Sequence, residues 1–169
     1  MVFEVIDMQS FSSLWFWIAL AAVWSSVSHW VLGVPFDMVT RARHLGGQAE
    51  ADLEHLARIH IERSLRTVEE SGLWLMAFGC FLLAGLGLLA FVYWIELAQA
   101  LFFLGFPLVL VWILSLRTAH RIRSEAAAGA LLCKRLTHLR YVTQAIGLLS
   151  LFVTSLWGMY SNLSAGFLG

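Results

Sequence analysis

Stretches free of ionised side chains alternate with charged segments along this chain, and they predict four membrane-spanning helices. No Asp, Glu, Lys or Arg lies between Asp7 and Asp37, and between residues 72 and 116 the only charge is Glu96. An apolar run of about 20 residues can cross a bilayer as a helix. Lipid offers no hydrogen-bond partner to backbone N–H and C=O groups, so only helices and closed barrels cross it. We expect spans at about residues 12–34, 72–94, 98–116 and 141–160.

The segment between the first two spans predicts an amphipathic helix over residues 48–71. Apolar side chains recur there at steps of three and four residues, with charged ones between them. Gly46 and Gly47 break the chain before this helix. Gly72 forces no break after it, so the helix can continue into the second span as one rod. The apolar positions are Leu53, Leu56, Ala57, Ile61, Leu65 and Val68.

The segment between the third and fourth spans, residues 117–140, is also compatible with helix, and Ser124–Glu125 before an alanine run predicts a helix start. Its six basic residues can contact anionic lipid or a partner. Three interpretations stay open: charge that orients the spans, docking of segments 35–71 and 117–140 on each other, and a partner or nucleotide site. The six are Arg117, Arg121, Arg123, Lys134, Arg135 and Arg140.

The distribution of basic residues predicts the orientation of the chain. All 11 Lys and Arg residues lie in segments 35–71 and 117–140. Basic loops stay on the cytoplasmic side, so both segments are expected there and both termini on the outer side of the membrane. The chain is 60% hydrophobic and only 13% charged, which excludes a soluble enzyme and a nucleic-acid binder. The expected fold is all-α, a single integral-membrane four-helix bundle.

One polar face inside the first span is a candidate for chemistry. Ser25, Ser28 and His29 stand at i, i+3 and i+4 and share a helix face. A histidine within a span is costly and is by default a functional hypothesis. An interhelical hydrogen bond, a proton or ion path, and a haem or metal ligand stay open for His29. The isolated Cys80 and Cys133 cannot form a cluster site within one chain.

Two stripes of small residues predict close helix packing. In the fourth span Gly147, Ser150, Thr154 and Gly158 fall on one face, and in the second span Cys80, Ala84 and Gly87 do the same. Small residues let helices approach where lipid supplies no hydrophobic drive. The stripes serve either contacts within the bundle or self-association and docking to a larger membrane complex.

Four segments carry a resemblance to a family. SLWFWIALAAVWSSVSHWVLGVPFDMV (13–39), SGLW (71–74), SLRTA (115–119) and SLFVTSLWGMY (150–160) are similar to small four-helix membrane proteins of alphaproteobacteria, some of which are labelled components of the Suf iron–sulfur assembly complex. The resemblance covers nearly the whole chain and implies a bacterial inner-membrane setting. It carries no motif of known chemistry.

Three functions are compatible with these features. The first is a non-enzymatic accessory or scaffold subunit, without cofactor or metal, that acts through helix packing and a charged cytoplasmic platform. The second is a homo-oligomeric channel or transporter with the Ser25/Ser28/His29 face or the fourth-span stripe lining a pore. The third is a haem- or quinone-associated respiratory or photosynthetic subunit, which rests on His29 and the tryptophans. No catalytic constellation is recognisable.

Overall fold

The computed structural model describes residues 14–167, with residue 162 and residues 164–167 described by their backbone only. About 90% of the structure is helical. The elements in chain order are α1 (Leu14–His29), β1 (Trp30–Val31), β2 (Val34–Pro35), α2 (Phe36–Leu45), α3 (Gly47–Phe91), α4 (Glu96–Ser124) and α5 (Gly129–Phe167).

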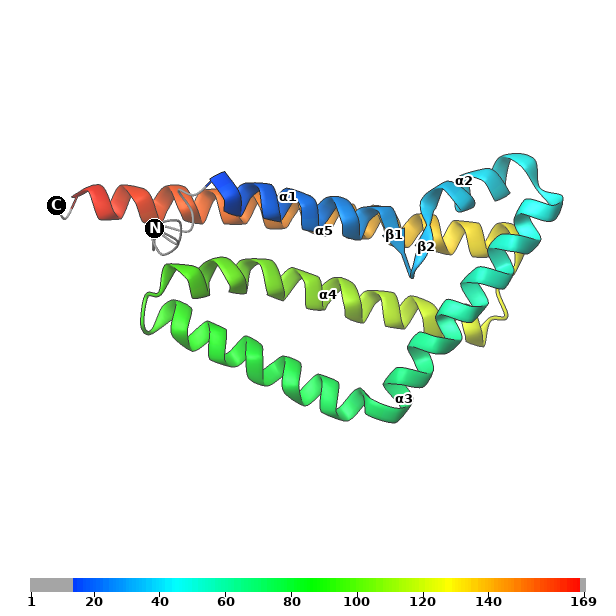
Figure 1. Cartoon of the computed structure of the whole chain (residues 1–169), viewed down its shortest axis with the longest axis horizontal. Coiled ribbons are helices and arrows are strands. Elements are labelled where there is room, and N and C mark those ends of the chain that lie inside the picture. The colour runs from blue at the N-terminus through cyan, green and yellow to red at the C-terminus, as the bar shows by residue number, and fades with distance from the viewer. Residues whose placement is uncertain (1–13, 168–169) are drawn as a thin grey trace, which may run out of the picture.

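α1, α4, α5 and the second half of α3 lie roughly along one long axis, and the first half of α3 runs obliquely to it (Figure 1). α1 and α5 lie side by side and antiparallel, with α4 beneath them and the second half of α3 beyond α4. The start of α1, the turn between α3 and α4, and the end of α5 lie at one end. The β1–β2 hairpin, α2, the first half of α3 and the α4–α5 turn gather at the other, which we call the charged end.

Among the described residues, three helices, α3, α4 and α5, are long and apolar enough to cross a membrane. α1 is apolar, and its described part, Leu14–His29, has 16 residues, fewer than the about 20 that a crossing takes. The expectation of a first span over residues 12–34 is therefore wrong at its inner end, because the helix ends at His29. Residues 12 and 13 lie outside the described residues.

A tight hairpin ends this first helical segment. Trp30 pairs with Pro35 and Val31 with Val34 in an antiparallel ladder. Leu32 and Gly33 form the turn with φ of 52° and 76°, and two-residue hairpin turns with both central residues at positive φ match the twist of paired strands. Pro35 then precedes α2 in an extended conformation, a position where its missing N–H costs nothing.

α3 is one unbroken helix of 45 residues, which confirms that the amphipathic helix continues into the second span. In its first half Leu53, Ala57, Ile61 and Leu65 are buried at every fourth position. The helix bends sharply between its two halves (Figure 1). The pair Ser71–Gly72 lies near its midpoint, and Gly/Ser pairs are a known cause of helix kinks.

The main apolar core lies at the charged end. There the first half of α3 packs against the hairpin, α2, the last turns of α4 and the first turns of α5. Of the three interpretations of the basic segment, docking of segments 35–71 and 117–140 on each other is therefore the arrangement found. The buried residues are Val31, Val34, Val39, Ala42, Leu53, Ala57, Ile61, Leu65, Ala119, Ile122, Leu132, Cys133, Leu136 and Leu139.

The expected helix start at Ser124–Glu125 is wrong. α4 ends at Ser124, and α5 begins at Gly129 after a turn in which Ala126 has φ of 44° and Gly129 has φ of 57°. The Glu125 carboxylate does not cap a helix but accepts hydrogen bonds from Arg121 of α4 and Arg135 of α5. The Arg135 contact joins the start of α5 to the end of α4 across the turn.

Candidate functional site

The small-residue stripe of α5 lies inside the chain. Thr154 has no exposed surface and Ser150 is 6% exposed, while Gly147 and Gly158 are also buried. A Cβ at Gly147 would lie 2.7 Å from Cε3 of Trp24 on α1, and the Ser150 hydroxyl donates a 3.3 Å hydrogen bond to the Phe103 carbonyl of α4. The stripe thus brings α1 and α4 onto α5.

The stripe of α3 has a different setting. Cys80 and Ala84 are exposed, whereas a Cβ at Gly87 would make ordinary contact with the Phe102 ring of α4 at 3.6 Å. Only 6% of the most apolar 18-residue window of α3 is buried, compared with 22% in α4 and 28% in α5. Most of the apolar half of α3 therefore has no partner among the described residues.

The polar face of α1 points outward. Ser25 and His29 are exposed and Ser28 is half-buried. The His29 ring lies edge-on to Trp30, with 6.1 Å between ring centroids, and makes no hydrogen bond to another helix in the described part of the chain. Among residues 14–167, no group of three or more His, Cys, Asp or Glu side chains is placed to hold a metal ion.

The six basic residues of segment 117–140 divide into paired and unpaired sets. Glu125 accepts from Arg121 Nε at 3.2 Å and from Arg135 Nη2 at 2.9 Å. Arg123 pairs with Glu69 of α3 at 3.0 Å. Arg140 lies 3.7 Å above the Phe36 ring, a cation–π contact. The two whose charge has no such partner among the described residues are Arg117 and Lys134.

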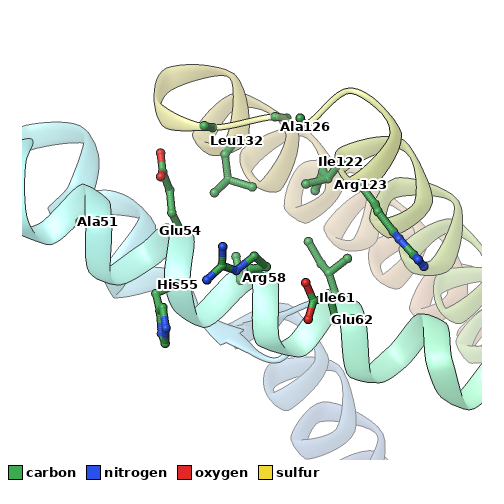
Figure 2. Close-up of a pocket in the computed structure, with 13 residues that line it drawn as sticks. Ala51, Glu54, His55, Arg58, Ile61, Glu62, Ile122, Arg123, Ala126 and Leu132 are labelled. Atoms are coloured by element: carbon green, nitrogen blue, oxygen red, sulfur yellow. The ribbon is translucent and has the colours of Figure 1, made fainter.

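A cleft of about 510 Å³ opens at the charged end between α3 and the α4–α5 turn. Ile61, Ile122 and Leu132 point toward one another in it (Figure 2). Glu54 accepts a hydrogen bond from the backbone N–H of Gly129, which closes one side of the cleft. Arg58 and Glu62 add one charge of each sign to its lining, so the cleft does not favour a ligand of either charge.

Cys133 lies in the core at the charged end. Burial raises the pKa of its thiol above the usual 9.0, and the nearby Glu50 carboxylate raises it further. Reactive cysteines have a lowered pKa and are accessible. Cys133 is therefore a neutral packing side chain of the core.

Sequence reasoning missed a buried polar network at the opposite end of the molecule. Gln99 of α4 is 3% exposed. Its amide Nε2 donates to the Ala90 carbonyl of α3 at 2.9 Å, and its Oε1 accepts from Trp157 Nε1 of α5 at 2.9 Å. One side chain thus joins three helices. The signal that could have indicated this network was the presence of Gln99, an amide side chain, in the otherwise apolar third span.

Aromatic rings surround this network. Phe91 of α3 lies edge-on to Phe102 of α4 at 5.6 Å and to Trp157 at 5.8 Å between ring centroids. Such geometries add about 0.5–1.5 kcal/mol per pair beyond area burial.

A comparison of the chain with models of protein families, with curated proteins and with solved structures finds no match in any of the three.

Proposed function

We propose that this chain is a non-enzymatic accessory subunit of the bacterial inner membrane that docks on a larger membrane complex through the apolar half of α3. In this arrangement α1 completes a four-helix bundle, the charged end lies in the cytoplasm and both termini lie in the periplasm. The separation of basic residues from the turn that carries Glu96 supports this orientation.

The exposed apolar half of α3 is the observation that carries the proposal. It combines the lowest burial of the three long helices with two exposed small residues, Cys80 and Ala84, on one face. Small residues on a helix surface let a second transmembrane helix approach closely. The core at the charged end holds α3 in place, so the chain presents a preformed face to a partner helix.

The experiment isolates tagged chain from native membranes in a mild detergent and measures the mass of the particle that contains it. We expect a particle of several different subunits. Ala84→Leu should lower the fraction of assembled chain, because the larger side chain holds the partner helix away. Ala145→Leu is the matched control, since Ala145 is an exposed alanine on the apolar part of α5.

Two results would contradict the proposal. A particle that contains only one copy of the chain and lipid would show that the chain has no partner subunit. A disulfide between the Cys80 thiols of two copies, in a particle without other subunits, would show that the α3 face joins identical chains, as the homo-oligomeric alternative requires.

A further inference from the structure

A second cleft, of about 790 Å³, lies where the apolar helices meet the charged end. α1 contributes its last turns, the hairpin contributes Leu32 and Gly33, α3 contributes residues on both sides of its bend, and α4 contributes its last apolar turns before Arg117. The cleft is open-sided and has one polar and one apolar part. In the orientation proposed above, this position corresponds to the depth at which lipid headgroups meet acyl chains.

The polar part of this cleft carries positive charge without acidic neighbours. Its ionisable lining residues are Arg63 and His60, both from α3, and no Asp or Glu lines it. The guanidinium of Arg63 makes no ion pair with any carboxylate that the structure describes, in contrast to Arg123 and Arg135. The Arg63 side chain is exposed, so its guanidinium is free to bind an anion from outside the described chain.

The apolar part consists of large side chains that extend from the polar part toward the membrane interior. Leu75 belongs to the apolar half of α3, and Leu108, Val111, Trp112 and Leu116 follow one another along α4. This wall continues the apolar surface that a bilayer covers. An occupant that matches both parts has an anionic head and a hydrocarbon tail.

The hairpin fixes the geometry of the polar part. Gly33 has φ of 76°, and a Cβ at that position would lie 2.6 Å from Nδ1 of His60. The imidazole is thus packed against the hairpin turn, on the helix turn that precedes Arg63. A preformed site loses less entropy when a ligand binds.

We propose that this cleft binds one anionic phospholipid of the surrounding bilayer, with its phosphate on Arg63 and one acyl chain along the α4 wall. Arginine binds phosphate oxygens in a bidentate, charge-assisted geometry, and a phosphate at Arg63 has no carboxylate in the lining to repel it. The site differs from the basic segment 117–140, where Glu125 and Glu69 already pair three of the arginines. It requires that the chain lies in a membrane and needs no protein partner.

The test measures lipid retained by the purified full chain in a mild detergent, with native mass spectrometry, after exposure to phosphatidylglycerol or phosphatidylcholine. We expect one phosphatidylglycerol to be retained in preference to phosphatidylcholine. Arg63→Gln should weaken this binding about fivefold, the loss that a cation near an anionic headgroup implies. Arg66→Gln should change it less than about twofold, because Arg66 is exposed on the same helix but does not line the cleft.

A second variant tests the apolar part. Ser115→Phe fills space beside the α4 wall and should also lower retention of phosphatidylglycerol, while circular dichroism and elution volume confirm that the variant is folded. Equal losses in Arg63→Gln and Arg66→Gln would overturn the proposal, since they would show general surface attraction. Unchanged retention in Ser115→Phe, or displacement of the lipid by glycerol 3-phosphate, would show that no acyl chain occupies the cleft and would overturn it as well.

Discussion

The Gln99 network provides a strict test of how α3, α4 and α5 are held together at the end opposite the charged end. The last carbonyls of a helix have no intrahelical partner, and Ala90 is the penultimate residue of α3. Gln99 Nε2 supplies the hydrogen bond that the Ala90 carbonyl lacks, while Gln99 Oε1 satisfies the buried indole N–H of Trp157. Gln99→Leu removes both hydrogen bonds and keeps much of the side-chain volume.

The magnitude follows from the number of bonds and the medium. Interhelical hydrogen bonds in membrane proteins contribute about 0.6 kcal/mol on average and up to about 1.7 kcal/mol. Loss of two bonds, with two buried groups left unpaired, should therefore lower the free energy of unfolding by about 1–3 kcal/mol. Trp157→Phe removes one bond and keeps the aromatic contacts, so we expect a loss of about 0.5–1.5 kcal/mol.

The assay is a double-mutant cycle. Unfolding of wild type, Gln99→Leu, Trp157→Phe and the double variant is followed by circular dichroism in micelles with a rising fraction of sodium dodecyl sulfate. The double variant should be more stable than additive losses predict, by about 0.6 kcal/mol or more. Gln144→Leu is the control, because Gln144 is half-buried on α5 and makes no hydrogen bond to a described side chain or backbone group.

Two results would refute this reasoning. Additivity of the two single losses to within about 0.3 kcal/mol would show that Gln99 and Trp157 are not coupled. An equal loss in Gln144→Leu and Gln99→Leu would show that the effect comes from removal of any amide in these helices.

Three further changes have expected outcomes. Gly147→Ala should lower the free energy of unfolding by about 1–3 kcal/mol in the same titration, since its Cβ would lie 2.7 Å from the indole of Trp24. Gly79→Ala is the control and should not destabilise the protein, because a Cβ at Gly79 would meet no atom within 4 Å. Gly33→Ala should cost about 1–2 kcal/mol, because its φ of 76° is left-handed, and should speed proteolysis near the hairpin. Because the pKa of Cys133 is raised in the folded protein, its thiol ionises at a lower pH in the unfolded chain than in the folded one. In a Cys80→Ala background stability should thus fall as pH rises past about 9, and additional Cys133→Ala should abolish that fall in thermal unfolding.

The features that the sequence predicted well are those that local patterns determine. Leu53, Ala57, Ile61 and Leu65 recur every four residues, and this period alone places them on one face of a helix. The continuity of α3 followed in the same way, because no residue between its two halves forbids helical φ and ψ. Length and apolar character were sufficient to identify α3, α4 and α5 as candidate spans.

The errors arose where hydrophobicity and conformation differ. Residues 30–34 are mostly apolar, so they extended the first predicted span, but Leu32 and Gly33 adopt positive φ and turn the chain back on itself. Gly33 followed closely by Pro35 is a turn signal that apolar length concealed. At Ser124–Glu125 the local helix-start pattern was misleading, because the chain turns there with positive φ at Ala126 and Gly129 and the next helix begins only at Gly129.

The two clefts and the Gln99 network were beyond prediction from the sequence because their parts are distant along the chain. Gln99 and Trp157 are separated by 58 positions, and neither pattern nor charge indicates that they meet. The cleft at the membrane boundary combines residues of α1, the hairpin, α3 and α4. From the sequence, Arg63 is one of several charged residues on the exposed face of a helix. Only the structure shows that it lines a cleft together with the apolar residues of α4.

The openness of this boundary cleft and the exposure of α3 have one cause. α3 is held at the charged end by the core around Leu53 and Leu65. At the other end it is held by the Gln99 hydrogen bond to Ala90 and by the edge-on contact of Phe91 with Phe102. Between these two fixed points α3 and α4 diverge (Figure 1). Buried hydrocarbon drives little helix association in lipid, so the bilayer does not force the helices together. These two points of attachment leave the cleft beside α4 open and most of the apolar half of α3 exposed, and these are the two features on which the lipid and partner proposals rest.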